Sequence, residues 1–262
     1  MSTVPAPASL APALREPLAG LLLAMADDEF VLGYWDSEWT GIAPMLEEDV
    51  AFSSLAQDEI GHAQAFLQLR AELSGEDPDA VAYGREPADF RHARLLDHGR
   101  GDWAFSIARR HLYETADALR LEALAGSTHA PLAELVAKVR REERYHLMHV
   151  GSWFVRLAEA GGEARRRLEA ALARLAPDAA TVFTPLPGET ALVEAGLMAA
   201  GNAHLAGRWQ ALLEPELARL RLPMPRWEPP ADGRHGHEAS EDFRWLHGEF
   251  TLVARSEAGV TW

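Results

Sequence analysis

Apolar residues recur every three or four positions in four long segments of the chain, at about residues 16–39, 45–73, 102–125 and 131–160. This spacing places them along one face of an α-helix. The alternating pattern that predicts β-strands does not stand out in any segment. The chain is therefore predicted to be all-α, with four long helices as its main elements.

The breaks between these segments predict how the helices are connected. Residues 40–44 and 126–130 are short turn sequences, so the first two and the last two long helices should form antiparallel hairpins. Residues 76–101 are rich in Pro and Gly and read as a long crossover with room for one short helix. Four weaker helices are expected after the core, at about residues 163–175, 189–194, 214–220 and 240–254.

Two of the long helices carry the same motif, Glu-x-x-His. The first copy pairs Glu59 with His62, and the second pairs Glu143 with His146. Residues three apart lie on the same face of a helix, so each motif directs a carboxylate and an imidazole the same way. That face is the apolar one, where an unpaired charge is very costly. A metal ion would supply the missing positive charge. Apolar neighbours at helical spacing are Phe52, Leu55, Phe66, Leu69 and Leu73 in one helix, and Leu132, Val136, Val139, Val150, Trp153 and Leu157 in the other.

The other two long helices each offer one carboxylate at a matching place. Glu29 lies 30 residues before Glu59, and Glu114 lies 29 residues before Glu143. Ferritin-like di-iron and di-manganese bundles use this combination, with Glu-x-x-His on two helices and one Glu on each of the others. The pattern favours a two-metal site over the alternative, a buried network of acids and histidines. The predicted ligands are Glu29, Glu59, His62, Glu114, Glu143 and His146.

This pattern predicts one ferritin-like domain over residues 1–262, a four-helix bundle with extra C-terminal helices. Residues 1–15 are expected to form a flexible arm, residues 16–160 the four-helix core, and residues 161–262 peripheral helices and loops. The longest apolar run, Leu21 to Ala26, is too short to span a bilayer. No membrane association is expected.

Composition narrows the function further. Asp and Glu number 40 against 25 Lys and Arg, a formal charge of −15, which argues against broad binding to nucleic acid. The chain contains no Cys, which excludes disulfides, iron–sulfur clusters and a Cys nucleophile. It also fits a reducing compartment, and a cytoplasmic protein is expected.

Some further residues invite a functional interpretation. His235 and His237 lie in a Gly/Pro-rich loop and are interpreted as a solvated or hydrogen-bonded pair rather than a second metal site. Asp28, Asp58 and Glu142 each precede a predicted ligand by one residue, which turns them about 100° away from the inward face. We expect them to support the ligands or to lie at the surface.

Three runs of arginine are interpreted as solvated faces. They are Arg109–Arg110, Arg140–Arg141 and Arg165–Arg167. One of these runs could meet an anionic partner or a CoA phosphate. The sequence does not favour one run over another for this role, and it assigns no catalytic residue.

The chain resembles the phenylacetic acid catabolism family, the A and C subunits of the multicomponent ring-1,2-phenylacetyl-CoA epoxidase. The resemblance runs from about Leu18 to Trp262 and is carried by residues 29–66, 102–127, 139–161 and 233–262. The stretches SEWTGIAPMLEEDVA and YHLMHVGSWFVRL and the final TW resemble the C-type chain of that family. QDEIGHA is more similar to the catalytic A-type chain.

This resemblance implies a C-type subunit of an oxygen-dependent acyl-CoA epoxidase. In that family, the A-type chain carries the di-iron site and receives electrons from a separate reductase component, whereas the C-type chain pairs with it and has often lost ligands. The expected partners are therefore a reductase, an A-type catalytic subunit and an acyl-CoA substrate, in a homo- or hetero-oligomer. Because all six ligand positions are retained here, two iron ions, or manganese, are expected. The alternatives are an autonomous di-iron or di-manganese oxygenase or oxidase and a metal-free ferritin-like scaffold.

Overall fold

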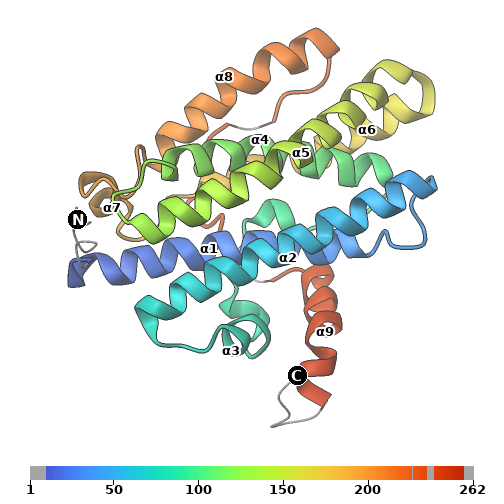
Figure 1. The fold of residues 1–262 in the computed structure, drawn as a ribbon. Helices are drawn as coiled ribbons and strands as arrows, with labels where there is room; N and C mark the ends of the chain where they lie inside the picture. Colours follow the sequence, from blue (N-terminus) through green and yellow to red (C-terminus); the bar gives the residue numbers. More distant parts are fainter. Residues whose placement is uncertain (1–9, 226, 235–238, 257–262) are drawn as a thin grey trace, which may run out of the picture.

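The computed structural model describes residues 10–225, 227–234 and 239–256, and it contains helices and loops but no strand within these ranges (Figure 1). The all-α prediction is confirmed. Four long helices form the core of a ferritin-like bundle. They are α1 (Pro12–Ser37), α2 (Leu46–Ser74), α4 (Trp103–Leu124) and α5 (Ala130–Ala160).

The hairpins form where the sequence predicts them. α2 runs back along α1, and α5 runs back along α4 (Figure 1). The α1–α2 pair is especially close at Gly33, where an added Cβ would lie 2.9 Å from the Cβ of Glu59. Only a residue without a side chain allows this approach, and it brings Glu59 against α1. Asp102 caps α4 by accepting a hydrogen bond from the backbone N–H of Phe105 at 2.9 Å.

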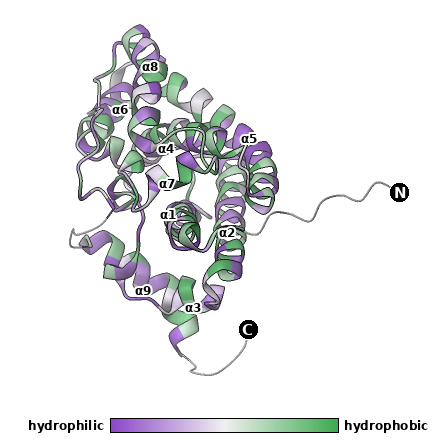
Figure 2. Cartoon of the chain, turned by 90° about the vertical axis from the view of Figure 1, so that its left-hand side faces the viewer, coloured by the Kyte–Doolittle hydropathy of each residue, from purple (hydrophilic) through white to green (hydrophobic). Residues whose placement is uncertain are grey.

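Two of the core helices are interior and two face solvent on one side. α4 buries 19 of its 22 residues, and α1 is buried on all sides over most of its length. Figure 2 looks nearly along α1 and shows it surrounded, with α2 beside it and α9 and α3 on the side opposite α4. Most polar side chains of α1 and α4 therefore lie inside the protein rather than at its surface.

Shorter elements cover the bundle. α6 and α8 pack on α4 and α5, α7 packs on α1, and α9 packs beside α1 and α3. They are α3 (Pro78–Tyr83), α6 (Gly162–Leu175), α7 (Glu189–Glu194), α8 (Asn202–Leu220) and α9 (Glu241–Ser256). Three 3₁₀ turns span Pro87–Asp89, Arg94–Leu96 and Ala179–Phe183. No helix among the described residues is long and apolar enough to cross a membrane.

The predicted element boundaries were wrong in two places. α8 begins at Asn202, well before the predicted start near residue 214. Pro215 therefore lies inside the helix rather than in its first turn, a position that proline normally disfavours. A buried stripe holds the helix together, formed by Leu205, Trp209, Leu213 and Leu217.

At the N-terminus, α1 already begins at Pro12, within the segment expected to be an arm. Residues 1–9, together with His235 and His237, lie outside the described residues.

Buried ion pairs tie distant parts of the chain to α1. Asp28 is fully buried and accepts hydrogen bonds from Arg120 of α4 at 2.6 Å and from Arg234 near the C-terminus at 2.7 and 2.8 Å. Burial raises the pKa of this carboxyl, but the charges of Arg234 and Arg120 outweigh burial and hold the pKa below its usual value. Asp28 thus joins α1, α4 and the C-terminal segment through charge.

Replacing Asp28 with Asn is predicted to destabilise the fold strongly, because it leaves two buried arginines without their anion. We expect a loss of about 3–5 kcal/mol in the free energy of unfolding, measured by denaturant titration at pH 7. The exposed Asp232, which lies 3.5 Å from Arg94, provides the control. Asp232→Asn should cost less than about 1 kcal/mol.

The pH dependence of this contribution has a definite sign. Because the pKa of Asp28 is depressed in the folded state, its stabilisation is present above the unfolded pKa and is lost as pH falls through the folded pKa. The difference between wild type and Asp28→Asn should therefore shrink in strong acid. A cost as small as that of Asp232→Asn at pH 7 would contradict this account.

Candidate metal centre

The structure brings all six predicted ligands together in the middle of the bundle. They form two overlapping groups whose candidate ligand atoms lie within 4.8 Å of one another. Every member is buried. The groups are Glu29, Glu59, His62 and Glu143, and Glu59, Glu114, Glu143 and His146. Glu59 and Glu143 belong to both groups.

The imidazole of His62 presents its Nδ1 atom to the first group. Nδ1 lies 3.3 Å from Oε2 of Glu29 and 3.2 Å from Oε1 of Glu143. The other ring nitrogen, Nε2, lies 2.8 Å from Oε2 of Glu142. A hydrogen bond of this kind fixes the orientation of the ring and favours the tautomer with a free Nδ1.

His146 repeats this arrangement in the second group. Its Nδ1 lies 3.3 Å from Oε1 of Glu59 and 3.1 Å from Oε1 of Glu143, and its Nε2 lies 3.2 Å from Oδ2 of Asp58. Each histidine is thus hydrogen-bonded by an acid from the opposite helix: Asp58 of α2 contacts His146 of α5, and Glu142 of α5 contacts His62 of α2.

One cation in the cluster was missed by sequence analysis. Arg110, expected on a solvated face, is fully buried and hydrogen-bonds to Asp36, to Glu114, and to Oε1 of Glu59 at 2.6 Å. Arg109 is also buried and donates to the backbone carbonyl of His98 at 2.7 Å. The interpretation of this run as surface was wrong, because α4 is interior on nearly every side.

Helical spacing contained a signal for the missed residues. Arg110 lies one turn before Glu114, and Asp36 lies two turns after Glu29, so each shares a face with a predicted ligand. The other two arginine runs agree better with the prediction. Arg140 and Arg141 are exposed, as are most of residues 165–167.

Tyr113 connects the cluster to the Asp28 network. Its hydroxyl donates to Oε1 of Glu29 at 2.6 Å and accepts from Arg120 at 3.0 Å. Arg120 in turn bonds to Asp28 and Asp117. Glu29 is therefore held through a chain of buried polar groups that extends beyond the cluster.

Burial and neighbouring charges divide the four glutamates of the metal-free cluster into two pairs. Burial and nearby carboxylates raise the pKa values of Glu29 and Glu114 well above the usual range. Burial also acts to raise the pKa values of Glu59 and Glu143. For Glu59, the charge of Arg110 outweighs burial and lowers the pKa. For Glu143, hydrogen bonds from His146 and His62 outweigh burial and lower the pKa.

The two histidines shift in the opposite sense to what burial alone would cause. Burial acts to lower the pKa of His62 and of His146, but hydrogen bonds to the surrounding glutamates raise them to about 12 and about 11. Without metal, the raised pKa values of the two histidines and of Glu29 and Glu114 favour the protonated forms of these four groups. Metal ions would have to displace these protons.

The chemistry of the donors fits a pair of transition-metal ions. Two buried carboxylate oxygens have no hydrogen-bond partner among the described residues, namely Oε2 of Glu59 and Oε2 of Glu114. Leaving such atoms unpaired in a protein interior is costly, and a bound metal ion would supply the missing partner. A set of carboxylates and imidazoles suits iron or manganese.

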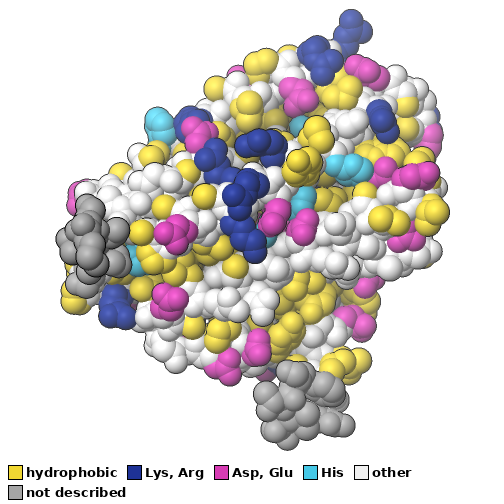
Figure 3. Space-filling model, in the orientation of Figure 1, with side chains coloured by type: hydrophobic (Ala, Val, Ile, Leu, Met, Phe, Trp, Pro, Cys, Tyr) yellow, Lys and Arg dark blue, Asp and Glu magenta, His cyan; other side chains and the backbone are white. Residues whose placement is uncertain are grey.

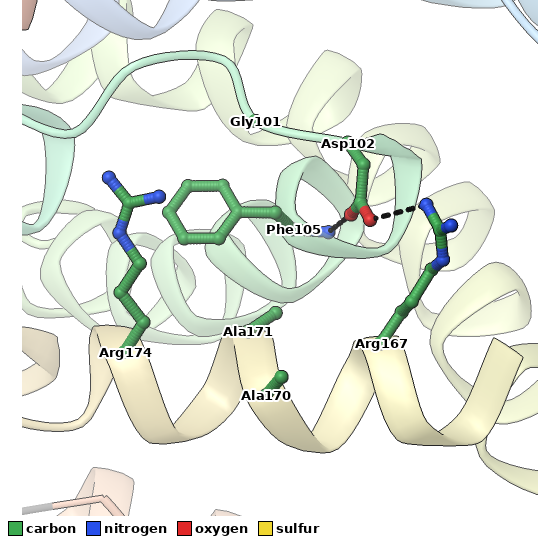
Figure 4. A pocket seen from close by; sticks show the side chains of 7 residues that line it. All are labelled: Gly101, Asp102, Phe105, Arg167, Ala170, Ala171 and Arg174. Atoms are coloured by element: carbon green, nitrogen blue, oxygen red, sulfur yellow. Dashed lines mark hydrogen bonds and ion pairs between the residues drawn. The ribbon is translucent and has the colours of Figure 1, made fainter. Parts of the chain in front are cut away.

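A separate surface hollow is a poor candidate for anion binding. It lies between the start of α4 and α6, has a volume of about 270 Å³ and contains none of the six ligands (Figure 4). Arg167 lies 3.0 Å from Asp102, and Arg174 covers the ring of Phe105 at 4.8 Å. Both arginines are already engaged, so they do not form an open site for a phosphate.

Comparison with known proteins agrees with the resemblance seen in the sequence. A family model described as phenylacetic acid catabolic protein matches residues 1–262. The chain is also similar to the C-type chain of 1,2-phenylacetyl-CoA epoxidase from Escherichia coli (strain K12). The two are 28% identical over 246 residues, which cover 94% of this chain and 99% of that protein.

The metal-free protein is predicted to lose stability as pH rises above about 6.5, the ordinary pKa of histidine. His62 and His146, together with Glu29 and Glu114, have raised pKa values in the folded state. Their contribution to stability is complete at a pH below their pKa values in the unfolded chain. It decreases as pH rises toward their pKa values in the folded protein. Melting curves between pH 5.5 and 9 in a chelator should show a falling Tm.

A double variant, His62→Gln with His146→Gln, provides the comparison for this slope. It removes the two imidazoles that take up protons and should flatten the decline. An equally steep decline in the double variant would show that other groups cause it.

Proposed function

The chain belongs to the family of phenylacetic acid catabolic proteins, and from this we propose that it is a C-type subunit of an oxygen-dependent epoxidase acting on phenylacetyl-CoA. Similarity to the C-type chain of the Escherichia coli epoxidase over nearly the whole length of both proteins supports this role. In the proposed complex, an A-type subunit carries out the ring epoxidation and a separate reductase supplies electrons. The present chain holds and orients the A-type subunit.

We further propose that this chain carries its own two-metal centre. The supporting observation is the convergence of four buried carboxylates and two inward-facing imidazole nitrogens, with one oxygen of Glu59 and one of Glu114 lacking a hydrogen-bond partner among the described residues. Iron or manganese bound there would supply redox chemistry with oxygen. The protein's own groups would hold the ions, with Glu59 and Glu143 shared between them and the histidines on either side.

Groups around the ligands would set their orientation and protonation. Asp58 and Glu142 accept from the Nε2 atoms and leave Nδ1 of each histidine free for a metal. Tyr113 holds one oxygen of Glu29 and directs the other toward His62. These contacts exclude water from the centre because all the groups except Asp58 and Glu142 are buried.

A metal-free scaffold is the second candidate function. The observation that favours it is Arg110, which already provides one positive charge inside the cluster. Elemental analysis of protein purified without added metal separates the two candidates. Iron or manganese at one or more ions per chain supports the metal centre, and less than a tenth of an ion supports the scaffold.

The exposed face of α5 is proposed as the surface that contacts the A-type subunit. Tyr145 and Met148 are 67% and 64% exposed there. Cations surround them, and Figure 3 shows Lys and Arg side chains gathered over this helix in a chain whose formal charge is −15. Four exposed cations lie along α5 around these two residues, namely Lys138, Arg140, Arg141 and Arg144, and none of the four forms an ion pair with a described residue. Aromatic, Met and Arg side chains are enriched in protein interfaces, and unpaired cations suit an acidic partner surface.

Loss of one shared glutamate should abolish binding of at least one metal ion without unfolding the protein. Glu59→Ala or Glu143→Ala removes both negative charge and coordination from the centre of the cluster. We expect elemental analysis to show the loss, while circular dichroism shows unchanged helix content. Glu134→Ala, at an exposed position of α5, is the control and should retain all metal. Full metal content in both glutamate variants would contradict the proposed centre.

Bound metal should reverse the pH dependence of stability. With Fe(II) or Mn(II) present, the ligands stay deprotonated, so Tm should rise with pH and fall on acidification as metal is lost. The comparison is a set of melting curves with and without the ion under anaerobic conditions. Identical curves in both conditions would indicate that the six residues are only a scaffold.

Substitution on α5 should disrupt the proposed complex but leave the chain folded. Met148→Glu places a charge in the apolar part of the surface and should weaken association with the A-type subunit, measured by light scattering of the mixture. Leu212→Glu, which alters a half-exposed residue of α8, is the matched control. Equal association of both variants would place the interface elsewhere, and no association of the wild type would overturn the C-type role.

A further inference from the structure

The two halves of the cluster are alike in their ligands but unequal in their cations. Each half has one glutamate of its own, the two shared glutamates, and a histidine held at Nε2 by an acid from the opposite helix. Among the described residues, an arginine contacts the unshared glutamate of one half, Glu114, but not that of the other half, Glu29. Arg110 bonds through Nη2 to both Glu114 and Glu59.

Arg110 contacts the cluster through Glu59 and Glu114, which both belong to the group that contains His146. Arg110 uses Oε1 of Glu59, and this is the oxygen that lies 3.3 Å from Nδ1 of His146. The oxygen of Glu59 left without a hydrogen-bond partner is Oε2. The guanidinium group therefore engages the same oxygen atom of Glu59 that lies on the side of His146.

Arg110 is also held firmly in this place. Its side chain is fully buried, and Nη1 bonds to Asp36, which is itself fully buried. Moving the guanidinium away would leave the buried Asp36 carboxylate without its charged partner, which is very costly in a protein interior. An ion entering this half must compete with a cation that is covalently part of the chain.

On the basis of the metal centre proposed above, we propose that Arg110 is a built-in cation that takes the place of a metal ion on the Glu114 side. The chain then holds one ion tightly, between Glu29, Glu59, His62 and Glu143. A second ion, on the side of His146, binds more weakly by roughly 100-fold, the upper end of what contacts to a metal ligand contribute. Loading of the two halves is sequential.

The matched histidines test this asymmetry in the otherwise unchanged protein. The full chain is stripped with a chelator, loaded anaerobically with Mn(II) or Fe(II), desalted and analysed for metal. We expect one ion per wild-type chain. His62→Ala should lose this ion, whereas His146→Ala should retain it. Loss of the ion to the same extent in both variants would overturn the proposal.

Arg110 itself is tested with a neighbouring control. Arg110→Met removes the built-in cation, and Arg109→Met removes an equally buried arginine of α4 that has no hydrogen bond to the cluster. Arg110→Met should raise retained metal from one to two ions per chain, and Arg109→Met should leave it at one. Isothermal titration calorimetry should show the second ion binding roughly 100-fold more tightly in Arg110→Met than in wild type.

The outcomes separate this proposal from the metal centre on which it rests. Two ions of equal affinity in the wild type, or one ion in both arginine variants, would overturn the role of Arg110 but leave the metal centre in place. No metal in any variant would overturn both and support the scaffold. If Arg110→Met fails to fold, the histidine pair and the wild-type stoichiometry decide the question.

Discussion

The burial of acidic side chains on α1 is the constraint on which the rest of the structure depends. Four carboxylates of this interior helix are fully or almost fully buried, and each needs a cation or a hydrogen-bond donor at close range. The partners come from different parts of the chain. Asp27 pairs with Arg85, Asp28 with Arg120 and Arg234, Glu29 with His62 and Tyr113, and Asp36 with Arg110. The crossover, α2, α4 and the C-terminal segment are thereby positioned around α1 by charge as well as by apolar packing.

This network gives the centre and the periphery a physical connection. The hydroxyl of Tyr113 joins Glu29 to Arg120, and Arg120 shares Asp28 with Arg234. A change of charge at Glu29 should therefore alter the interactions of Arg120 and Asp28, and Asp28 binds Arg234 of the C-terminal segment. Buried hydrogen-bonded groups in a low-dielectric interior interact more strongly than they would in water. Stability and the charge state of the cluster are coupled for this reason.

Sequence reasoning captured the parts of the structure that depend on helical period alone. Two features of the sequence predicted that the four glutamates converge. Each glutamate lies on the apolar face of its helix, and the offsets within the two hairpins are nearly equal. The four are Glu29, Glu59, Glu114 and Glu143. What it missed depends on tertiary context. Arg109 and Arg110 were interpreted as solvated because arginine usually is, but α4 is enclosed by α5, α6 and α8. The first half of α8 was also missed: the helix was predicted at about residues 214–220, whereas α8 begins at Asn202 and contains Pro215.

The most informative residue in the cluster is not one of the predicted ligands. Met25 and Arg110 occupy corresponding places, each four residues before the glutamate that its helix contributes to the cluster. Both are buried, but one is apolar and the other brings a positive charge to within 2.6 Å of a shared ligand. The two hairpins therefore repeat the same set of candidate ligands but differ in the charge placed beside them. Under the proposal made above, an interior cation and a metal ion compete for the same carboxylates, so the residue one turn from a ligand would influence metal content together with the ligand itself.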